Sequence, residues 1–265
     1  MPLDGAPRRF FEGELPPPEP FAEHVLALWS FDVRLPPGEV ALHTIWPDGC
    51  VSLSVVCSAG APVAASVVGP RLRALRIPMR SGLTLRGIRL WPDTGAQVLG
   101  VDPVSIRDLA RPAAELLGVS ALGLARGVAK AVDDAAVADV WEQWLEPRIA
   151  AAALPDPDVR FVVRLLIDSD GAMEVGAAAK QAGLGVRALE RRFSAAVGMS
   201  PTQFARVRRV RAAIAAIMGG ERSVARLAGR GDAMKFVRDF RSVAGVRPEE
   251  LFAELDQFET GDVAE

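Results

Sequence analysis

Apolar residues in the first hundred positions occur in short runs, and turn-forming residues separate these runs. Within a run the apolar side chains can alternate with polar ones, as Val51, Leu53 and Val55 do. Short strands divided by Pro and Gly turns are typical of a β-sandwich or a small barrel. The pattern predicts a β-rich core over about residues 21–100, after an extended Pro- and Glu-rich segment (1–20). The expected strands cover residues 25–33, 40–46, 51–57, 63–68 and 83–91.

From residue 104 the spacing of apolar residues changes to the period of a helix. The first helix is expected to run from there to Gly118, which has the conformational freedom to end it. Two further helices are expected over residues 121–132 and 135–152. Together the three form a helical connector over about residues 103–152.

Residues 154–158 (Leu-Pro-Asp-Pro-Asp) are the best linker in the chain. The two prolines stop one helix, and Asp158 is suited to cap the next. Beyond the linker the pattern is helical to about residue 255. The prediction is an α+β chain with a β-rich sandwich or barrel-like regulatory domain that includes the connector, an all-α domain and an acidic tail. The expected boundaries are 1–155, 156–252 and 253–265.

An internal repeat is the most specific feature of the sequence. Residues 191–201 reappear as residues 238–248, at an offset of 47. The repeated glycine ends a helix in the left-handed conformation, and the repeated proline opens the next helix. Two copies of one helical unit indicate two similar modules, which suits a duplex groove read twice along one face. The identical pairs are Arg191 and Arg238, Phe193 and Phe240, Gly198 and Gly245, and Pro201 and Pro248.

The first copy has the pattern of a helix-turn-helix. A short helix over residues 174–181 and a Gly-Leu-Gly turn precede a second helix over residues 186–196. Its early outer positions hold Arg187, Glu190 and Arg191. In a recognition helix, Arg can donate two hydrogen bonds to a guanine edge and Glu can accept one from cytosine N4. These residues predict major-groove readout.

The stretch 179–201, with Phe204 and Arg209 in the helix that follows, resembles the AraC-type (arabinose regulator) family of transcription factors. The resemblance covers about residues 158–252. It implies two helix-turn-helix units joined by a long helix, which holds them about one turn of DNA apart. The base-reading positions that it implies are Arg187, Glu190 and Arg191 in the first unit, and Met234, Lys235, Val237 and Arg238 in the second.

Two departures from the family pattern matter. Gly185 stands where the family has Ser, which weakens the helix N-cap by a few tenths of a kcal/mol. Residues 223–231 are about two residues short for the family's positioning helix, and Arg230 replaces an aromatic residue. The second unit can therefore be distorted and contribute phosphate contacts instead of base readout. The alternative is a protein-interaction co-regulator with only weak, non-specific DNA binding.

Charge along the chain agrees with a nucleic-acid partner. The net charge is -2, yet residues 171–248 carry 15 basic and 5 acidic side chains. A compact basic block in an otherwise acidic chain is the footprint of a polyanion-binding module. An ion pair inside the protein is as good an expectation as DNA contact for Arg209. Contacts with DNA phosphates are expected from Arg192, Arg206, Arg208 and Arg211.

The N-terminal half resembles a little-characterised sensor-like domain that precedes AraC-type DNA-binding units. Residues 46–50, 68–70 and 86–100 carry this resemblance. It implies a regulatory role without naming an effector, and the family often uses the region of the connector to form a homodimer. The aromatic residues Trp29, Trp46 and Trp91 either line a pocket for a small-molecule effector or belong to the core.

Nothing in the sequence predicts an enzyme, a metal or a cofactor. His24 and His43 lack the spacing of metal ligands, and no phosphate loop or nucleophile elbow occurs. Cys50 and Cys57 are seven apart in one expected strand and point to opposite faces, so they are expected to be free thiols. The uncharged stretch 51–69 is interrupted by Gly and Pro, and no secretory signal is apparent. These features predict a cytoplasmic protein that does not enter a membrane.

Overall fold

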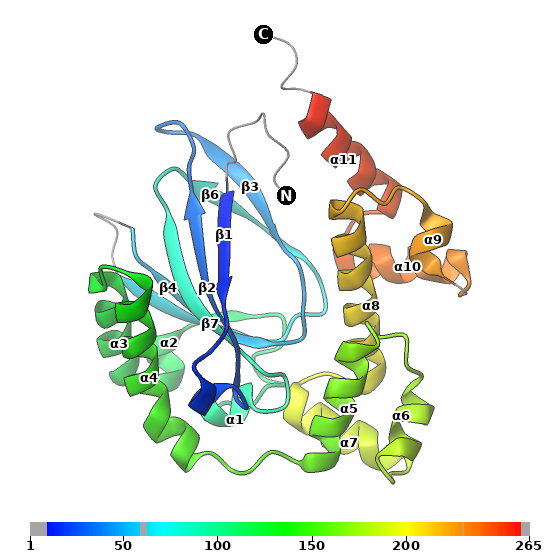
Figure 1. Ribbon diagram of the computed structural model, residues 1–265, viewed down its shortest axis with the longest axis horizontal. Helices are drawn as coiled ribbons and strands as arrows, with labels where there is room; N and C mark the ends of the chain where they lie inside the picture. The colour runs from blue at the N-terminus through cyan, green and yellow to red at the C-terminus, as the bar shows by residue number, and fades with distance from the viewer. Residues whose placement is uncertain (1–9, 59–62, 230, 261–265) are drawn as a thin grey trace.

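The computed structural model describes residues 10–58, 63–229 and 231–260. It is α+β, with a β-rich N-terminal half beside a helical C-terminal half (Figure 1), as predicted. Six strands form one sheet in the order β1-β2-β7-β4-β5-β8, and β3 pairs with β6 in a second. The sheets do not close into a barrel. The strands are β1 (Phe10–Leu15), β2 (Val25–Val33), β3 (Val40–Ile45), β4 (Val51–Val56), β5 (Ala64–Val68), β6 (Leu75–Arg80), β7 (Thr84–Leu90) and β8 (Ala110–Pro112).

The five predicted strands correspond to β2, β3, β4, β5 and β7. In β4 the alternation of apolar and polar residues becomes alternation of burial, because Val51, Leu53 and Val55 are buried and the residues between them are partly exposed. The sequence did not predict β1, β6 or β8 as strands. Pro78 lies inside β6, and a proline without an N–H group argues against a strand unless the strand has a free edge.

Helices cover one face of the six-stranded sheet (Figure 1). Leu124 and Trp141 from these helices pack in one core with Leu53 and Ile88 from the sheet. The first predicted helix is wrong over most of its length, because α2 begins only at Ala113. The helices here are the 3-10 helix η1 (Glu19–Phe21), α1 (Gly95–Leu99), α2 (Ala113–Leu117), α3 (Ser120–Lys130) and α4 (Asp134–Ala151).

Backbone geometry explains why the helix predicted from residue 104 to Gly118 does not form over most of its length. Asp108 has φ 59°, a left-handed conformation that a right-handed helix excludes. Ala110–Pro112 instead pairs with β5 as β8. The predicted cap at Asp158 is also wrong: Asp156 caps α5, and its Oδ1 accepts from the backbone N–H groups of Asp158 and Val159.

The C-terminal half contains two helical units that share α8. Phe204 and Ala205 belong to the core of the first unit, while Val207 and Ile217 belong to the core of the second. The first unit comprises α5 (Pro157–Asp168), α6 (Val175–Gln181) and α7 (Val186–Val197); after α8 (Pro201–Met218), the second comprises α9 (Val224–Ala228), α10 (Ala233–Ala244) and α11 (Pro248–Thr260).

The internal repeat is confirmed as a structural repeat. Phe193 and Phe240 are both fully buried in the cores of their units. Gly198 and Gly245 end α7 and α10 at φ 82° and 80°, in the left-handed region. Pro201 opens α8 at its first turn. Within the residues described, no helix combines the length and apolar character that crossing a membrane requires.

Candidate DNA interface

The outer face of α7 carries the three side chains expected to read bases in the first unit. Arg187, Glu190 and Arg191 are exposed, whereas Leu189 and Phe193 on the inner face are fully buried. Within the described part of the chain, none of the three outer side chains has an ion-pair or hydrogen-bond partner. Packing thus holds the inner face of α7 and leaves the outer charges available to a ligand.

The outer face of α10 presents three of the four positions expected in the second unit. Lys235 and Arg238 are exposed, and 73% of Met234 is accessible to solvent. Val237 is half-buried and packs against the core of this unit, so its side chain is held away from the outer face. Asp232 caps the helix by accepting from the backbone N–H of Met234.

The second unit has a shorter positioning helix than the first. α9 spans five residues, against seven in α6. Ser223 caps α9, and α10 packs on α8 and α9, so the unit keeps a folded core despite the shortening. Arg230, which the sequence placed in the turn, lies outside the described residues. At the first unit, Gly185 supplies no side-chain hydrogen bond to cap α7.

Two arginines expected to bind phosphate instead pair within the protein. Arg192 donates from Nε to Asp156 Oδ2 at 2.6 Å and from an NH2 group to Asp158 at 2.9 Å. This ties α7 to the start of α5, and the hydrogen bonds hold the pKa of Asp156 below its ordinary value. Arg206 Nε lies 3.1 Å from Asp239, which joins α8 to α10. Both arginines therefore stabilise contacts between helices of the protein.

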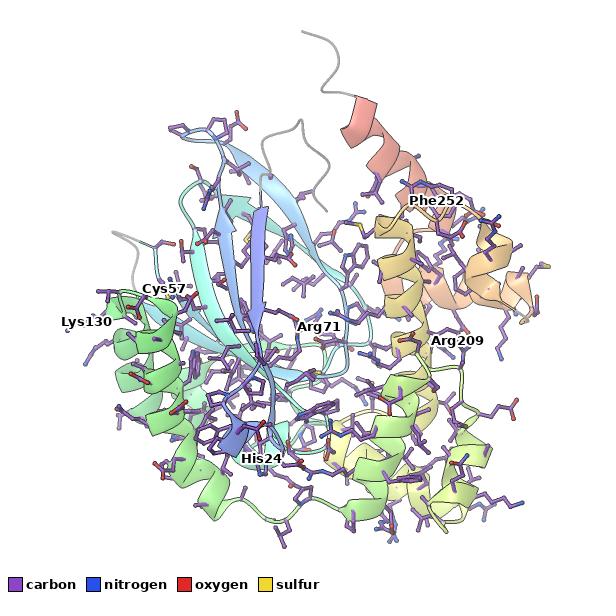
Figure 2. All side chains as sticks on the ribbon, in the orientation of Figure 1. His24, Cys57, Arg71, Lys130, Arg209 and Phe252 are labelled. Atoms are coloured by element: carbon purple, nitrogen blue, oxygen red, sulfur yellow. The ribbon has the colours of Figure 1, made fainter. Side chains whose placement is uncertain are left out.

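The remaining arginines of α8 face the N-terminal half or the first unit. Burial raises the pKa of the Cys50 thiol, and the nearby charges of Arg208 and Arg211 oppose that rise. Both guanidinium groups therefore lie near the start of β4. Arg209, whose place on α8 Figure 2 shows, donates to the carbonyl of Gly171 at 2.9 Å. Arg209 therefore has a structural role, although its contact is a hydrogen bond and not an ion pair.

The three tryptophans considered for an effector pocket lie in different surroundings. Trp29 lines a cavity of about 100 Å³ between β1, β2, β7 and α4. Trp46 packs against the core of the second helical unit. Trp91 donates from its indole N–H to the carbonyl of Ala22, and the Arg164 guanidinium lies 3.1 Å from its ring centroid. Trp46 and Trp91 are not among the residues that line the cavity.

Much of the N-terminal sequence that carried the family resemblance forms contacts with the helical units. A Cβ atom on Gly49 would lie 2.5 Å from the Phe204 ring, so only glycine admits this contact. The buried carboxylate of Asp93 accepts from Arg160 Nε of α5 at 2.9 Å. The sequence pattern did not predict this interface, although the Trp-Pro-Asp-Gly-Cys motif at 46–50 marks part of it.

Among the described residues, no three His, Cys, Asp or Glu side chains lie together as a metal site. The two cysteines flank β4 and are free; Cys50 is buried, whereas Cys57 is half-buried. Burial is the main influence on both histidines and lowers the pKa of each.

Sequence-family models match both halves of the chain. Residues 178–254 match a helix-turn-helix domain, the AraC-type one, and residues 13–111 match a domain of unknown function (DUF6597). No curated protein matches the chain in a sequence comparison. The helix-turn-helix domain is that of a transcription regulator and not of an enzyme.

The solved structures that the chain matches include several of ToxT from Vibrio cholerae. An apo form from strain SCE256 is 12% identical, with a TM-score of 0.41, and the match covers 94% of this chain and 98% of that one. A second ToxT structure is 10% identical, with a TM-score of 0.44 and coverage of 81% and 97%. On the evidence of its sequence domains, the chain is a DNA-binding transcription regulator with an AraC-type helix-turn-helix domain behind an N-terminal domain of unknown function.

Proposed function

We propose that the protein binds specific DNA sequences and that α7 reads base edges in the major groove. The observation that carries this proposal is the outer face of α7, where Arg187, Glu190 and Arg191 are exposed and unpartnered within the described structure. Arg offers two parallel donors to a guanine edge, and Glu offers an acceptor to cytosine. In the second unit, Lys235 and Arg238 are the corresponding exposed groups.

The length of α8 supports simultaneous contact by both units. Its 18 residues span roughly 27 Å at the helical rise per residue. Successive major grooves on one side of a duplex are about 34 Å apart. Because α8 contributes to both cores, its length sets the separation of the two units, which we propose is close to one turn of DNA.

For the regulatory part of the function, we propose a domain over residues 1–155 that senses a signal and forms a homodimer, followed by a DNA-binding domain over residues 156–252. The cavity beside Trp29 is about 100 Å³, below the 300–1,000 Å³ of most small-molecule pockets. A small-molecule effector would therefore have to be only a few atoms in size to fit this cavity. Sedimentation of the purified chain with and without duplex tests the homodimer.

Selection from a pool of short random duplexes, repeated across a salt series, tests the sequence-specific function. We expect one sequence class to be enriched and to lose about 10-fold or more in affinity with Arg187→Ala or Arg191→Ala, since a bidentate contact is worth about 1–3 kcal/mol. Arg80→Ala, on the exposed surface of β6 and outside the connector, is the charge-matched control. Equal loss with all three variants would contradict base reading by α7.

The short α9 favours one alternative, a protein-interaction co-regulator whose second unit no longer reads DNA. This alternative predicts no enriched sequence and weak binding that disappears at physiological salt. The same selection experiment therefore separates the two functions. Enrichment of a sequence with a single half-site would show that the first unit reads DNA without base contacts from the second.

A further inference from the structure

An open groove of about 450 Å³ lies where the N-terminal half meets the outer face of α10. Arg73, Arg238, Arg241, Ser242 and Gly245 line it. Arg238 and Arg241 are one helical turn apart, so their side chains emerge on the same side of α10. Arg73 comes from the segment between β5 and β6 and is exposed. A residue from outside the helix-turn-helix domain thus extends the basic surface of the second unit.

The segment that carries Arg73 is held in place by Asp108. The Asp108 carboxylate accepts from the backbone N–H of Leu72 at 2.7 Å, and its carbonyl accepts from Arg71 at 3.1 Å. Arg71 also donates to the carbonyl of Arg73 at 3.2 Å. Figure 2 shows Arg71 between the sheets and α8. These bonds fix the backbone on both sides of Leu72 and so restrict where Arg73 can lie.

The same segment is fastened to the helical units. The side chain of Leu72 packs against the cores of both units. The backbone N–H of Ala74 donates to the carbonyl of Val243, near the end of α10, at 2.7 Å. Arg76 forms an ion pair with Glu254 of α11 at 3.0 Å. Arg73 is therefore flanked by contacts that bind its segment to the second unit.

The positive charges in the groove favour the binding of an anion. Three guanidinium groups line it, and none of its five lining residues carries a carboxylate. Asp239, the acidic residue of α10, lies instead beside Arg206 of α8. Like charges held together repel each other, and an anion placed between them gains from all three. Arginine forks match the geometry of phosphate oxygens, and Ser242 adds a hydroxyl donor.

We propose that this groove binds a backbone phosphate of the DNA whose major groove α10 enters, and that Arg73 makes the contact from the N-terminal half. The inference rests on the proposed DNA-binding function and adds a residue outside the helix-turn-helix domain to the interface. The N-terminal half then contributes directly to DNA affinity as well as to regulation. Phosphate contacts from Arg73 and Arg241, with the charge of Arg238 beside them, would anchor the second unit even where base readout is weak.

Binding of the full chain to its selected duplex across a salt series tests the proposal. Arg73→Gln removes the charge, Arg73→Lys retains it, and Arg80→Gln on β6, an exposed arginine outside the connector, is the charge-matched control. We expect Arg73→Gln to weaken binding about 3- to 10-fold and to reduce the slope of log affinity against log salt by about 0.9. Arg73→Lys should keep the wild-type slope, and Arg80→Gln should change neither quantity.

A second readout locates the contact. Hydroxyl-radical footprinting should show that Arg73→Gln loses protection at the backbone next to the second unit's site, with protection at the first unit's site retained. Thermal unfolding of Arg73→Gln should match wild type. An unchanged footprint and a salt slope equal to that of Arg80→Gln would overturn the role of Arg73 while leaving the proposed function intact. Failure of the wild-type chain to bind any duplex would instead overturn both.

Discussion

Arg160 of α5 is bound to Asp93 of the N-terminal half, and this carboxylate is only 1% exposed. The same guanidinium contacts the Glu23 carboxylate at 2.6 Å and the Glu23 carbonyl at 3.0 Å. Arg164, one turn further along α5, lies over the ring of Trp91. The two arginines attach the first helical unit to the loop after β7. This attachment makes α5 part of the interface between the two halves.

Removing the Arg160 charge should lower the stability of the protein, because it breaks this attachment. Arg160→Met keeps the aliphatic bulk but leaves Asp93 buried without its charge partner, and breaking such a pair costs about 3 kcal/mol. The free energy of unfolding, measured by urea denaturation at neutral pH, should fall by that amount. Arg126→Met on the surface of α3 should change it by less than about 0.5 kcal/mol. Similar values for the two variants would contradict a structural role for the pair.

The two repeated glycines provide a matched comparison. Alanine at either Gly198 or Gly245 must adopt a positive φ, which costs about 1 kcal/mol. At Gly198 the new Cβ would also lie 2.6 Å from the Pro103 carbonyl oxygen, whereas at Gly245 nothing lies within 4 Å. We expect Gly198→Ala to be less stable than Gly245→Ala by about 1–3 kcal/mol in urea denaturation. Equal losses would mean that Pro103 moves away without cost.

Adjacent arginines on α7 should differ in what they do. Arg191→Ala should weaken specific DNA binding and leave stability unchanged, because its side chain has no described partner. Arg192→Ala should lower stability, because it breaks the bonds to Asp156 and Asp158. Urea denaturation and DNA titration of both variants check this. A loss of stability in Arg191→Ala with none in Arg192→Ala would reverse the assignment.

The Arg192 pair also predicts a pH dependence. Hydrogen bonds from Arg192 lower the pKa of Asp156 below its ordinary value of 3.8. A carboxyl group with a lowered pKa in the folded state contributes stability above its unfolded pKa, and loses it as pH falls through the folded value. The stability difference between wild type and Arg192→Ala should therefore be present at pH 5–7 and shrink below about pH 4. A difference that stays constant down to pH 2 would contradict the pair's role.

The thiol of Cys50 can report on contact between the two halves. Burial raises the pKa of this thiol, and Arg208 and Arg211 of α8 lie nearby. In the Cys57→Ser variant, the Cys50 thiol should react slowly with a thiol reagent at pH 8, because the reactive thiolate is scarce and inaccessible. Half-buried Cys57 should react faster in Cys50→Ser. Adding Arg160→Met should accelerate labelling of Cys50 if the halves separate; an unchanged rate would show that the interface persists.

The sequence predicted the helical units well because their signals are local. Apolar residues at helical spacing, a turn glycine and a first-turn proline specify α7 and its partner α10 with few neighbours involved. It also predicted which side of α7 faces outward. The failure at α2 arose where Asp108 adopts a left-handed backbone and its carboxylate accepts from the backbone N–H of Leu72, a distant residue of the same half. Tertiary contacts there overrode the helical period.

The phosphate contacts expected from the sequence were limited in the same way, because tertiary contacts decide where each arginine lies. A high density of arginine on α8 indicates positive charge but not its direction, and the charges of Arg208 and Arg211 act on the buried Cys50 thiol of the N-terminal half by opposing the rise of its pKa. Arg73 lies in a loop far from the basic block in sequence, so charge counting could not bring it to α10. Pairing between distant segments decides which arginines stay available for DNA.

The shared helix α8 restricts how this protein can change during evolution. Inserting or deleting one residue in its middle would rotate everything after that point by about 100°. The second unit would then present a different side of α10, and Leu72 would no longer meet both cores. Loops such as the one at Gly38, with open space around it, can vary in length at little cost. Divergent relatives that keep this arrangement should therefore differ in their loops while preserving the number of residues in α8.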